Sequence, residues 1–136
     1  RPSLSSSSAA SDVYKRQIKM SRSRLRYIHK LVETFPDDAD KNRFFCKDLF
    51  LPRFNPLVLG EAMRAIVPSN SPQDQKMAKH RDELIEIMED YVQLMTANPF
   101  LPEKAKRRLR MQAMVLRTKS RLVVRAAQIV NRKLQG

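Results

Sequence analysis

The chain contains very little glycine, cysteine or tryptophan, and these shortages exclude several kinds of site. Its 136 residues include two glycines, one cysteine and no tryptophan. With only Gly60 and Gly136 available, no glycine-rich loop can cradle a phosphate group. A single cysteine, Cys46, excludes an internal disulfide framework and fits a reducing compartment. The chain is still long enough for one domain with one core.

No segment alternates apolar and polar residues over a length that would predict a β-sheet. Apolar residues recur instead at steps of three and four, which is the period of an α-helix. The stretches without charge are far shorter than the roughly 20 apolar residues that a membrane-spanning helix needs. We therefore expect an all-α fold, a small irregular bundle of about five helices, without a transmembrane segment.

Residues that could form a catalytic or metal centre are scarce. The two histidines, His29 and His80, are far apart in the sequence, and neither has a cysteine or a second histidine nearby. No CxxC or HExxH spacing occurs. Cys46 lies in a phenylalanine-rich segment, so we interpret it as a buried thiol. We expect no catalytic residue, no metal site and no cofactor, and hence a protein that acts by binding.

The first nineteen residues differ in composition from the rest. Residues 3–8 are mostly serine, and residues 1–19 offer little that a core could bury. Such low-complexity sequence is typically disordered. The string SLSSSSAASDVYKRQ also resembles translated library-adapter sequence, with Met20 as the start; the alternative is a basic, serine-rich targeting peptide. We therefore assign residues 20–136 to a single helical domain and leave residues 1–19 outside it.

Proline and aspartate mark the predicted helix ends in the first half of the domain. The first helix covers residues 21–35 and ends before a proline, which disfavours helical backbone in the preceding residue. Asp37 or Asp38 can cap a second helix, which carries several phenylalanines and stops before Pro52. Asn55–Pro56 predicts the cap and first turn of a third, short helix.

The second half is predicted to hold two longer helices. Ser71–Pro72 again has the pattern of a cap and first turn, and apolar residues repeat at helical steps to about Thr96. Asn98–Pro99 ends this helix, and Pro102 opens the last one. The last helix is predicted to be continuous over residues 103–134, which corresponds to about 48 Å at 1.5 Å per residue.

On a helical wheel, the last helix has two apolar stripes with a basic strip between them. The first stripe consists of Ala105, Leu109, Ala113, Leu116, Val123, Ala127, Val130 and Leu134. The second stripe consists of Met111, Val115, Leu122 and Ile129. The basic strip consists of Lys106, Arg110, Arg117, Arg121, Arg125 and Arg132. Two stripes predict two packing partners: the protein's own core, and either another chain or a further part of the same fold.

The positive charge is concentrated at the C-terminal end. The net charge is +13, of which residues 103–136 carry +10. Such an excess favours RNA, an anionic membrane surface or an acidic protein as partner, the alternative being general solubility. The last aromatic residue is Phe100, so RNA contact along the basic strip would involve the backbone or the shape of the RNA rather than base stacking. We also expect Arg22, Arg24 and Arg26 to form an arginine-rich outer face on the first helix.

The segment after Met20 resembles the start of a known family. The resemblance is carried by Arg24, Lys30, Leu31, Glu33, Phe35, Pro36 and Asp38, and Arg53–Phe54 is similar to the end of the family's second helix. The family is the mitochondrial nucleoid factor family, also called ubiquinol–cytochrome c reductase complex assembly factor 2. The specific resemblance covers residues 20–55, and a weaker similarity reaches about residue 100. The long basic C-terminal helix departs from the family pattern.

The resemblance implies a small helical chaperone without catalytic residues or cofactors. Its expected location is the mitochondrial matrix or the matrix face of the inner membrane, where peripheral membrane association and association with the nucleoid are compatible with its role. It would bind a second complex III assembly factor and receive newly made cytochrome b near the mitochondrial ribosome. We expect partner contacts at the three N-terminal arginines and at the second apolar stripe, and contacts to RNA or an acidic partner along the basic strip.

Two other classes of binding protein compete with this interpretation. LYR-type helical adaptors bind acyl carrier protein, and Leu25-Arg26-Tyr27 is a scrambled form of their Leu-Tyr-Arg motif, with Phe44 or Phe50 as a compatible downstream phenylalanine. Co-purification of an acylated carrier protein would favour that class. A structural mitochondrial ribosomal protein would lay its last helix on RNA, and binding to a duplex would weaken by about 0.9 log unit per log unit of salt for each phosphate neutralised.

The predicted apolar face of the first helix can be tested by one substitution. Leu31→Asp should unfold the domain, because an unpaired buried charge costs several kcal/mol. Circular dichroism during a urea titration measures the effect. A variant that remains fully folded would contradict the predicted burial.

Overall fold

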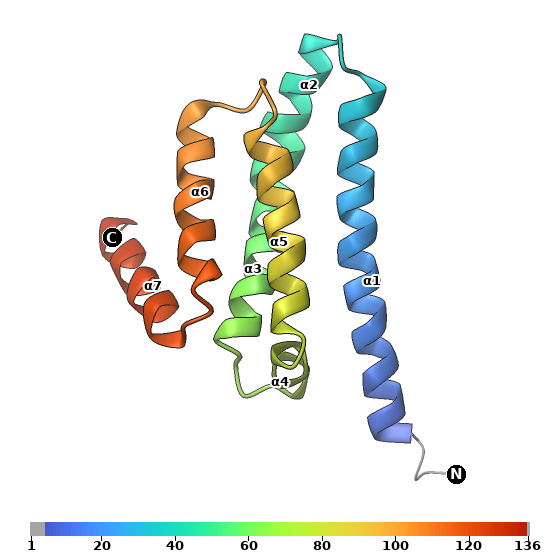
Figure 1. The fold of residues 1–136 in the computed structure, drawn as a ribbon, viewed down its shortest axis with the longest axis vertical. Helices are drawn as coiled ribbons and strands as arrows, with labels where there is room; N and C mark the ends of the chain where they lie inside the picture. Colours follow the sequence, from blue (N-terminus) through green and yellow to red (C-terminus); the bar gives the residue numbers. More distant parts are fainter. Residues whose placement is uncertain (1–4, 136) are drawn as a thin grey trace.

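The computed structural model describes residues 5–135, and these residues form an all-α fold without strands (Figure 1). The elements in chain order are α1 (Ser5–Thr34), α2 (Ala39–Phe45), the π-helix η2 (Cys46–Phe54), α3 (Asn55–Ile66), α4 (Pro72–Ala78), α5 (Arg81–Thr96), α6 (Glu103–Arg117) and α7 (Arg121–Gln135). In the same range, no helix combines the length and apolar character needed to cross a membrane. The predicted fold class is confirmed, whereas several predicted boundaries are wrong.

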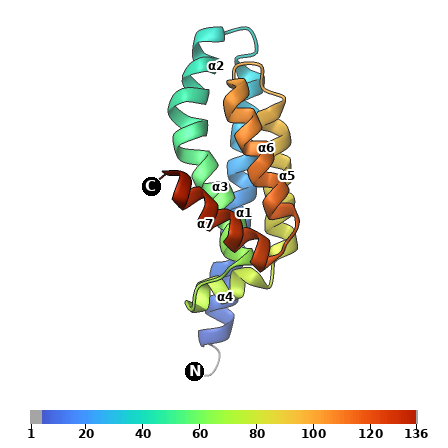
Figure 2. The same cartoon turned by 90° about the vertical axis from the view of Figure 1, so that its left-hand side faces the viewer.

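Helix α5 occupies the centre of the bundle. It packs against α1, α3 and α6 (Figures 1 and 2). The side chains of Met88, Tyr91 and Met95 on α5 are completely buried. As a result, α1 and α7 lie at opposite edges of the molecule, with α5 and α6 between them (Figure 1).

Helix α1 begins earlier than expected. Disorder was predicted for residues 1–19, but α1 starts at Ser5; residues 1–4 lie outside the described part of the chain. Ile18 is 7% exposed and belongs to a small apolar cluster with residues of α3, α4 and α5. The burial of Ile18 comes from helices that are distant in the sequence, so local composition could not reveal it. Further along α1, Ile28 is completely buried, and Leu31 is partly buried against the core.

A buried carboxylate attaches α1 to α3. Glu61 of α3 is only 5% exposed. Its Oε2 accepts a hydrogen bond from Ser21 Oγ at 2.6 Å, and its Oε1 pairs with Arg24 Nη1 at 3.2 Å. A second pair, between Arg22 Nη2 and Glu83 Oε1 at 3.0 Å, links α1 to α5 at a more exposed position. Because buried charges are costly unless they are paired, the Glu61 cluster constrains where α1 can dock.

The predicted helix end before Pro52 is wrong. Helix α2 continues directly into η2, which contains Pro52, and η2 continues into α3 without a break. The backbone N–H of Asn55 donates to Phe50 O, five residues back, so the wider π turn accommodates the proline. The Asn55 side chain does not cap a helix: its Oδ1 accepts a hydrogen bond from the hydroxyl of Tyr91 on α5. Burial raises the pKa of Tyr91, which keeps this hydroxyl protonated as a donor.

Two of the predicted caps are confirmed. Asp38 Oδ1 accepts from the backbone N–H of Lys41 at 3.0 Å, which caps α2. Ser71 Oγ accepts from the N–H of Asp74 at 3.1 Å, which caps α4. The helix predicted from Ser71 to Thr96 is nevertheless interrupted, because the backbone departs from helical geometry at His80 and separates α4 from α5.

The Glu61 cluster generates a stability prediction. Glu61→Ala leaves Arg24 and Ser21 without their buried partner and should lower the free energy of unfolding by about 3 kcal/mol. Glu83→Ala removes the more exposed pair with Arg22, which links α1 to α5, and should cost no more than about 1 kcal/mol. Urea denaturation of both variants measures the difference. Equal losses for the two variants would show that Glu61 does not anchor α1.

Candidate docking surface on the C-terminal helices

The predicted C-terminal helix is broken at residues 118–120, so a continuous helix over residues 103–134 is wrong. Lys119 has a φ of 55°, in the left-handed region, and this reverses the chain direction between α6 and α7. The N–H of Lys119 donates to Leu116 O at 3.0 Å, which closes the end of α6. Its Nζ donates to Asp82 Oδ1 of α5 at 2.8 Å. Lys119, the residue with left-handed backbone, is therefore also held to α5 by an ion pair.

The break divides both predicted apolar stripes. In the first stripe, Leu109, Ala113 and Leu116 of α6 are buried in the core, whereas Val130 and Leu134 of α7 are exposed. The buried apolar anchor of α7 is Val124, which belongs to neither predicted stripe. A wheel drawn for one straight helix cannot place residues correctly on both sides of a reversal.

Helix α7 is attached to the bundle by a narrow set of contacts. Besides the burial of Val124, Arg121 Nε donates to Ile66 O at 3.3 Å, and Gln128 Nε2 donates to Met63 Sδ at 2.8 Å. All of these contacts lie on the side of α7 that faces α3 and α6. Most of the apolar surface of α7 is consequently left without a partner in the described part of the chain.

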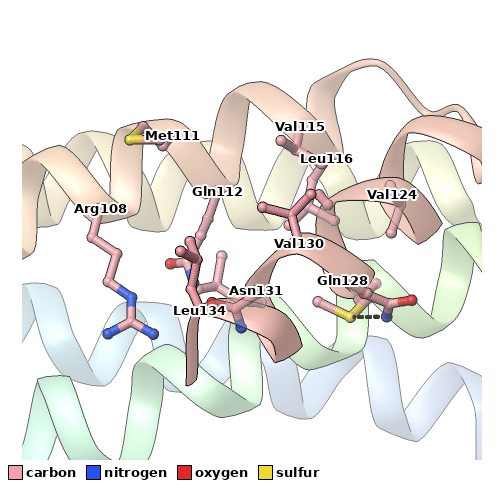
Figure 3. Close-up of a pocket in the computed structure, with 13 residues that line it drawn as sticks. Arg108, Met111, Gln112, Val115, Leu116, Val124, Gln128, Val130, Asn131 and Leu134 are labelled. Carbon is pink, nitrogen blue, oxygen red and sulfur yellow. Dashed lines mark hydrogen bonds between the residues drawn. The ribbon is translucent and has the colours of Figure 1, made fainter. Parts of the chain in front are cut away.

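An apolar groove of about 370 Å³ lies between α3, α6 and α7 (Figure 3). Its apolar lining includes Leu59, Met63, Met111, Val115, Val130 and Leu134. Polar side chains are few, and Arg108 lies at the opposite end of the groove from Val124 (Figure 3). Leu134 is 81% exposed and Val130 is 56% exposed, so the groove is open to solvent. An apolar hollow with a few polar groups at its edge is the usual form of a binding site.

The second predicted stripe is divided between the groove and the outside of α7. Met111 and Val115 line the groove. Leu122 and Ile129 do not line it, and they are 82% and 52% exposed. The stripe is therefore not one continuous surface, but its four residues all lie on or beside the exposed part of α6 and α7.

The basic strip is likewise only partly available to a partner. Lys106 is buried, with Glu103 3.6 Å away, which corrects its assignment to an exposed strip. Arg117 forms two hydrogen bonds of 2.9 Å with Glu89 of α5, and Arg121 is held by the carbonyl of α3 described above. Half of the strip thus contacts acidic or carbonyl groups of the protein itself, from α6 in the case of Lys106 and from α5 and α3 in the case of the two arginines. Arg110, Arg125 and Arg132 are exposed and form no ion pair with any side chain of residues 15–134, the range in which the structure describes side chains.

No acidic residue follows Glu103, although eleven lysines and arginines do. The groove and the exposed side of α7 therefore lie in a part of the chain that carries charge of one sign only. A surface that combines exposed apolar groups with unbalanced positive charge favours a partner with both apolar and anionic groups.

The three N-terminal arginines do not form one outer face. Arg22 forms an ion pair with Glu83 of α5, and Arg24 forms one with Glu61 of α3. Two of the three arginines therefore pair with acidic residues of the same protein. Arg26 alone is exposed, and its Nη2 donates to Ser23 Oγ at 2.8 Å. The acidic partners come from α3 and α5, and the sequence of α1 contains no sign of them.

The single cysteine and the arrangement of possible metal ligands were the remaining candidates for a reactive site in the described residues. Cys46 is buried, as predicted, and Asn98 Nδ2 lies 3.5 Å from its Sγ. Burial raises the pKa of the Cys46 thiol, which disfavours the reactive thiolate. Within the described part of the chain, no three histidine, cysteine or carboxylate side chains come together as metal ligands would. The site with the most developed geometry is therefore the groove.

Comparison of the chain with protein-family models, with curated proteins and with solved structures finds no match.

The left-handed residue between α6 and α7 can be tested with two matched substitutions. Lys119→Gly and Lys119→Ala both remove the ion pair with Asp82, but only glycine adopts a positive φ without cost. The glycine variant should therefore be the more stable of the two by about 1 kcal/mol. Thermal or urea unfolding measures this difference. In a continuous helix the order would be reversed, because alanine is preferred over glycine by about 1 kcal/mol there.

Proposed function

We propose that this chain is a non-catalytic binding protein of the assembly-factor type, and that the groove between α3, α6 and α7 holds the apolar side of a partner polypeptide. The observation that carries the proposal is the open groove itself, with Val130 and Leu134 left exposed at its edge. A protein rarely leaves a continuous apolar hollow uncovered unless another molecule fills it.

A helix is the partner segment that fits best. The groove is bounded by residues of three helices, α3, α6 and α7, and an apolar groove between helices is the kind of surface that receives an amphipathic helix. Two methionines, Met63 and Met111, contribute to the lining, and their flexible thioether side chains adapt to different partner residues. Arg108 at the end of the groove would pair with an acidic group that flanks the apolar side of the partner.

The finer proposal is a mitochondrial assembly factor for respiratory complex III. Its support is the resemblance of residues 20–55 to the mitochondrial nucleoid factor family. In that role a second assembly factor or newly made cytochrome b would occupy the groove, near the mitochondrial ribosome on the matrix face of the inner membrane. None of the residues that line the groove lies within residues 20–55, so the specific resemblance and the groove are independent lines of support.

A second candidate function is contact with RNA, which the exposed Arg110, Arg125 and Arg132 favour. These arginines have no ion-pair partner among the side chains of residues 15–134, and they lie in the C-terminal part of the chain, where no acidic residue follows Glu103. Binding of this kind would depend strongly on salt, whereas an apolar groove contact would not.

The groove assignment can be tested by changing its exposed edge. Val130→Ser combined with Leu134→Ser removes apolar surface that is already exposed, so stability should change by less than about 0.5 kcal/mol. Affinity purification from mitochondria at two salt concentrations should then show at least a tenfold loss of the complex III assembly factor or cytochrome b, by analogy with other apolar hot spots.

Leu57→Ser is the matched control, since Leu57 is an exposed apolar residue of α3 outside the groove lining. It should leave partner recovery unchanged. Full recovery of the same polypeptides by the double variant would rule out the groove as their binding site. Recovery of RNA alone, lost at the higher salt concentration, would favour the second candidate function instead.

A further inference from the structure

Helix α7 carries a second uncovered apolar surface, on its outer side. Leu122 and Ile129 are seven residues apart, so they lie on one line along the helix, with the exposed Ala126 between them. We call these three residues the outer ridge. None of them lines the groove. The outer ridge is therefore left uncovered even when the groove is filled.

Positive charge accompanies the outer ridge along the same helix. Arg125, Arg132 and Lys133 are exposed, and none forms an ion pair within the part of the chain that the structure describes. The nearest neighbour along the chain, α6, adds exposed cations and only one acidic residue, Glu103, at its far end. The electrostatic potential around the outer ridge is thus positive without compensation.

The shape of this region separates it from the groove. Helix α7 lies on the outside of the bundle and crosses α6 and α3 at an angle, with its outer side directed away from all other helices (Figures 1 and 2). A single convex helix offers no hollow into which a partner side chain or helix could insert. A fluid bilayer can instead close around a convex apolar ridge while its headgroups meet the flanking cations.

We propose that α7 binds the surface of an anionic membrane, with the outer ridge inserted at the boundary between headgroups and acyl chains and with Arg125, Arg132 and Lys133 in contact with anionic headgroups. Exposed Leu and Ile on one side of a helix with lysine and arginine beside them are the features of helices that lie in the membrane interface. The proposal does not depend on what fills the groove, because the two surfaces use different residues.

The test uses the full chain and two kinds of vesicle, one of phosphatidylcholine alone and one of phosphatidylcholine mixed with phosphatidylglycerol. Cosedimentation should show at least about tenfold stronger partition onto the anionic vesicles, since each cation near an anionic surface contributes roughly a fivefold factor. Leu122→Ser combined with Ile129→Ser should lower this partition by at least about tenfold, because the apolar insertion is lost. Arg125→Gln combined with Arg132→Gln should lower partition onto the anionic vesicles and leave the weak partition onto neutral ones unchanged.

Two controls keep the outcomes distinct. Leu57→Ser changes an exposed apolar residue on α3 and should leave vesicle binding intact. Val130→Ser with Leu134→Ser changes the groove edge, and this variant should also bind vesicles while it loses the proposed protein partner. Circular dichroism should give the same helix content for all variants, since every substituted side chain is exposed.

Several results would overturn the proposal. One is failure of the unaltered protein to bind anionic vesicles at low salt. Another is vesicle binding that the ridge variant retains in full and that salt abolishes, which is adsorption by charge alone. A third is loss of vesicle binding in the groove variant but not in the ridge variant, which would show that the bilayer contacts the groove edge of α7 and not the outer ridge. Whether the groove variant also loses its protein partner is measured in the affinity purification described above, and that result tests the proposed function rather than membrane binding.

Discussion

The burial of α5 is the constraint on which the rest of the structure depends. Its residues Met88, Tyr91 and Met95 have no exposed surface, and they contact helices from the beginning, middle and end of the chain. The Tyr91 hydroxyl must find a partner in this apolar environment and finds it in Asn55, where η2 meets α3. One central helix therefore sets the position of α1, α3 and α6 together.

This central packing also determines what remains exposed. Helix α6 uses Leu109, Ala113 and Leu116 to cover α5 and α3, and the chain then reverses at Lys119. Val124 is the fully buried apolar side chain of α7, whereas the larger apolar residues on the rest of this helix are exposed. The groove and the outer ridge both arise from a shortage of core surface, which is expected for a chain of this size.

Electrostatics reinforces the same division between inside and outside. The acidic residues of α3 and α5 pair with cations from both ends of the chain, as Glu61 does with Arg24 and Glu89 with Arg117. These pairs account for several of the arginines that the sequence pattern suggested for partners. The cations of α7 have no acidic counterpart among the described side chains of residues 15–134, so net positive charge is concentrated beside the uncovered apolar surface of this helix. Assembly with a polypeptide at the groove and contact with an anionic bilayer at the outer ridge are compatible uses of that combination.

The sequence by itself determined the helical class, the caps at Asp38 and Ser71, the buried thiol at Cys46 and the C-terminal position of the positive charge. These features depend on local periodicity, on hydrogen bonds that span only a few residues, or on composition, so they can be read along the chain. The burial of Ile18, the hydrogen bond from Tyr91 to Asn55 where η2 meets α3, and the ion pair at the Lys119 reversal all involve helices that are distant in the sequence. The same is true of the groove, since it joins Leu59 of α3 to Val130 of α7. Only the tertiary structure could decide which face of each amphipathic helix is buried, because a periodic pattern specifies a face without specifying what covers it.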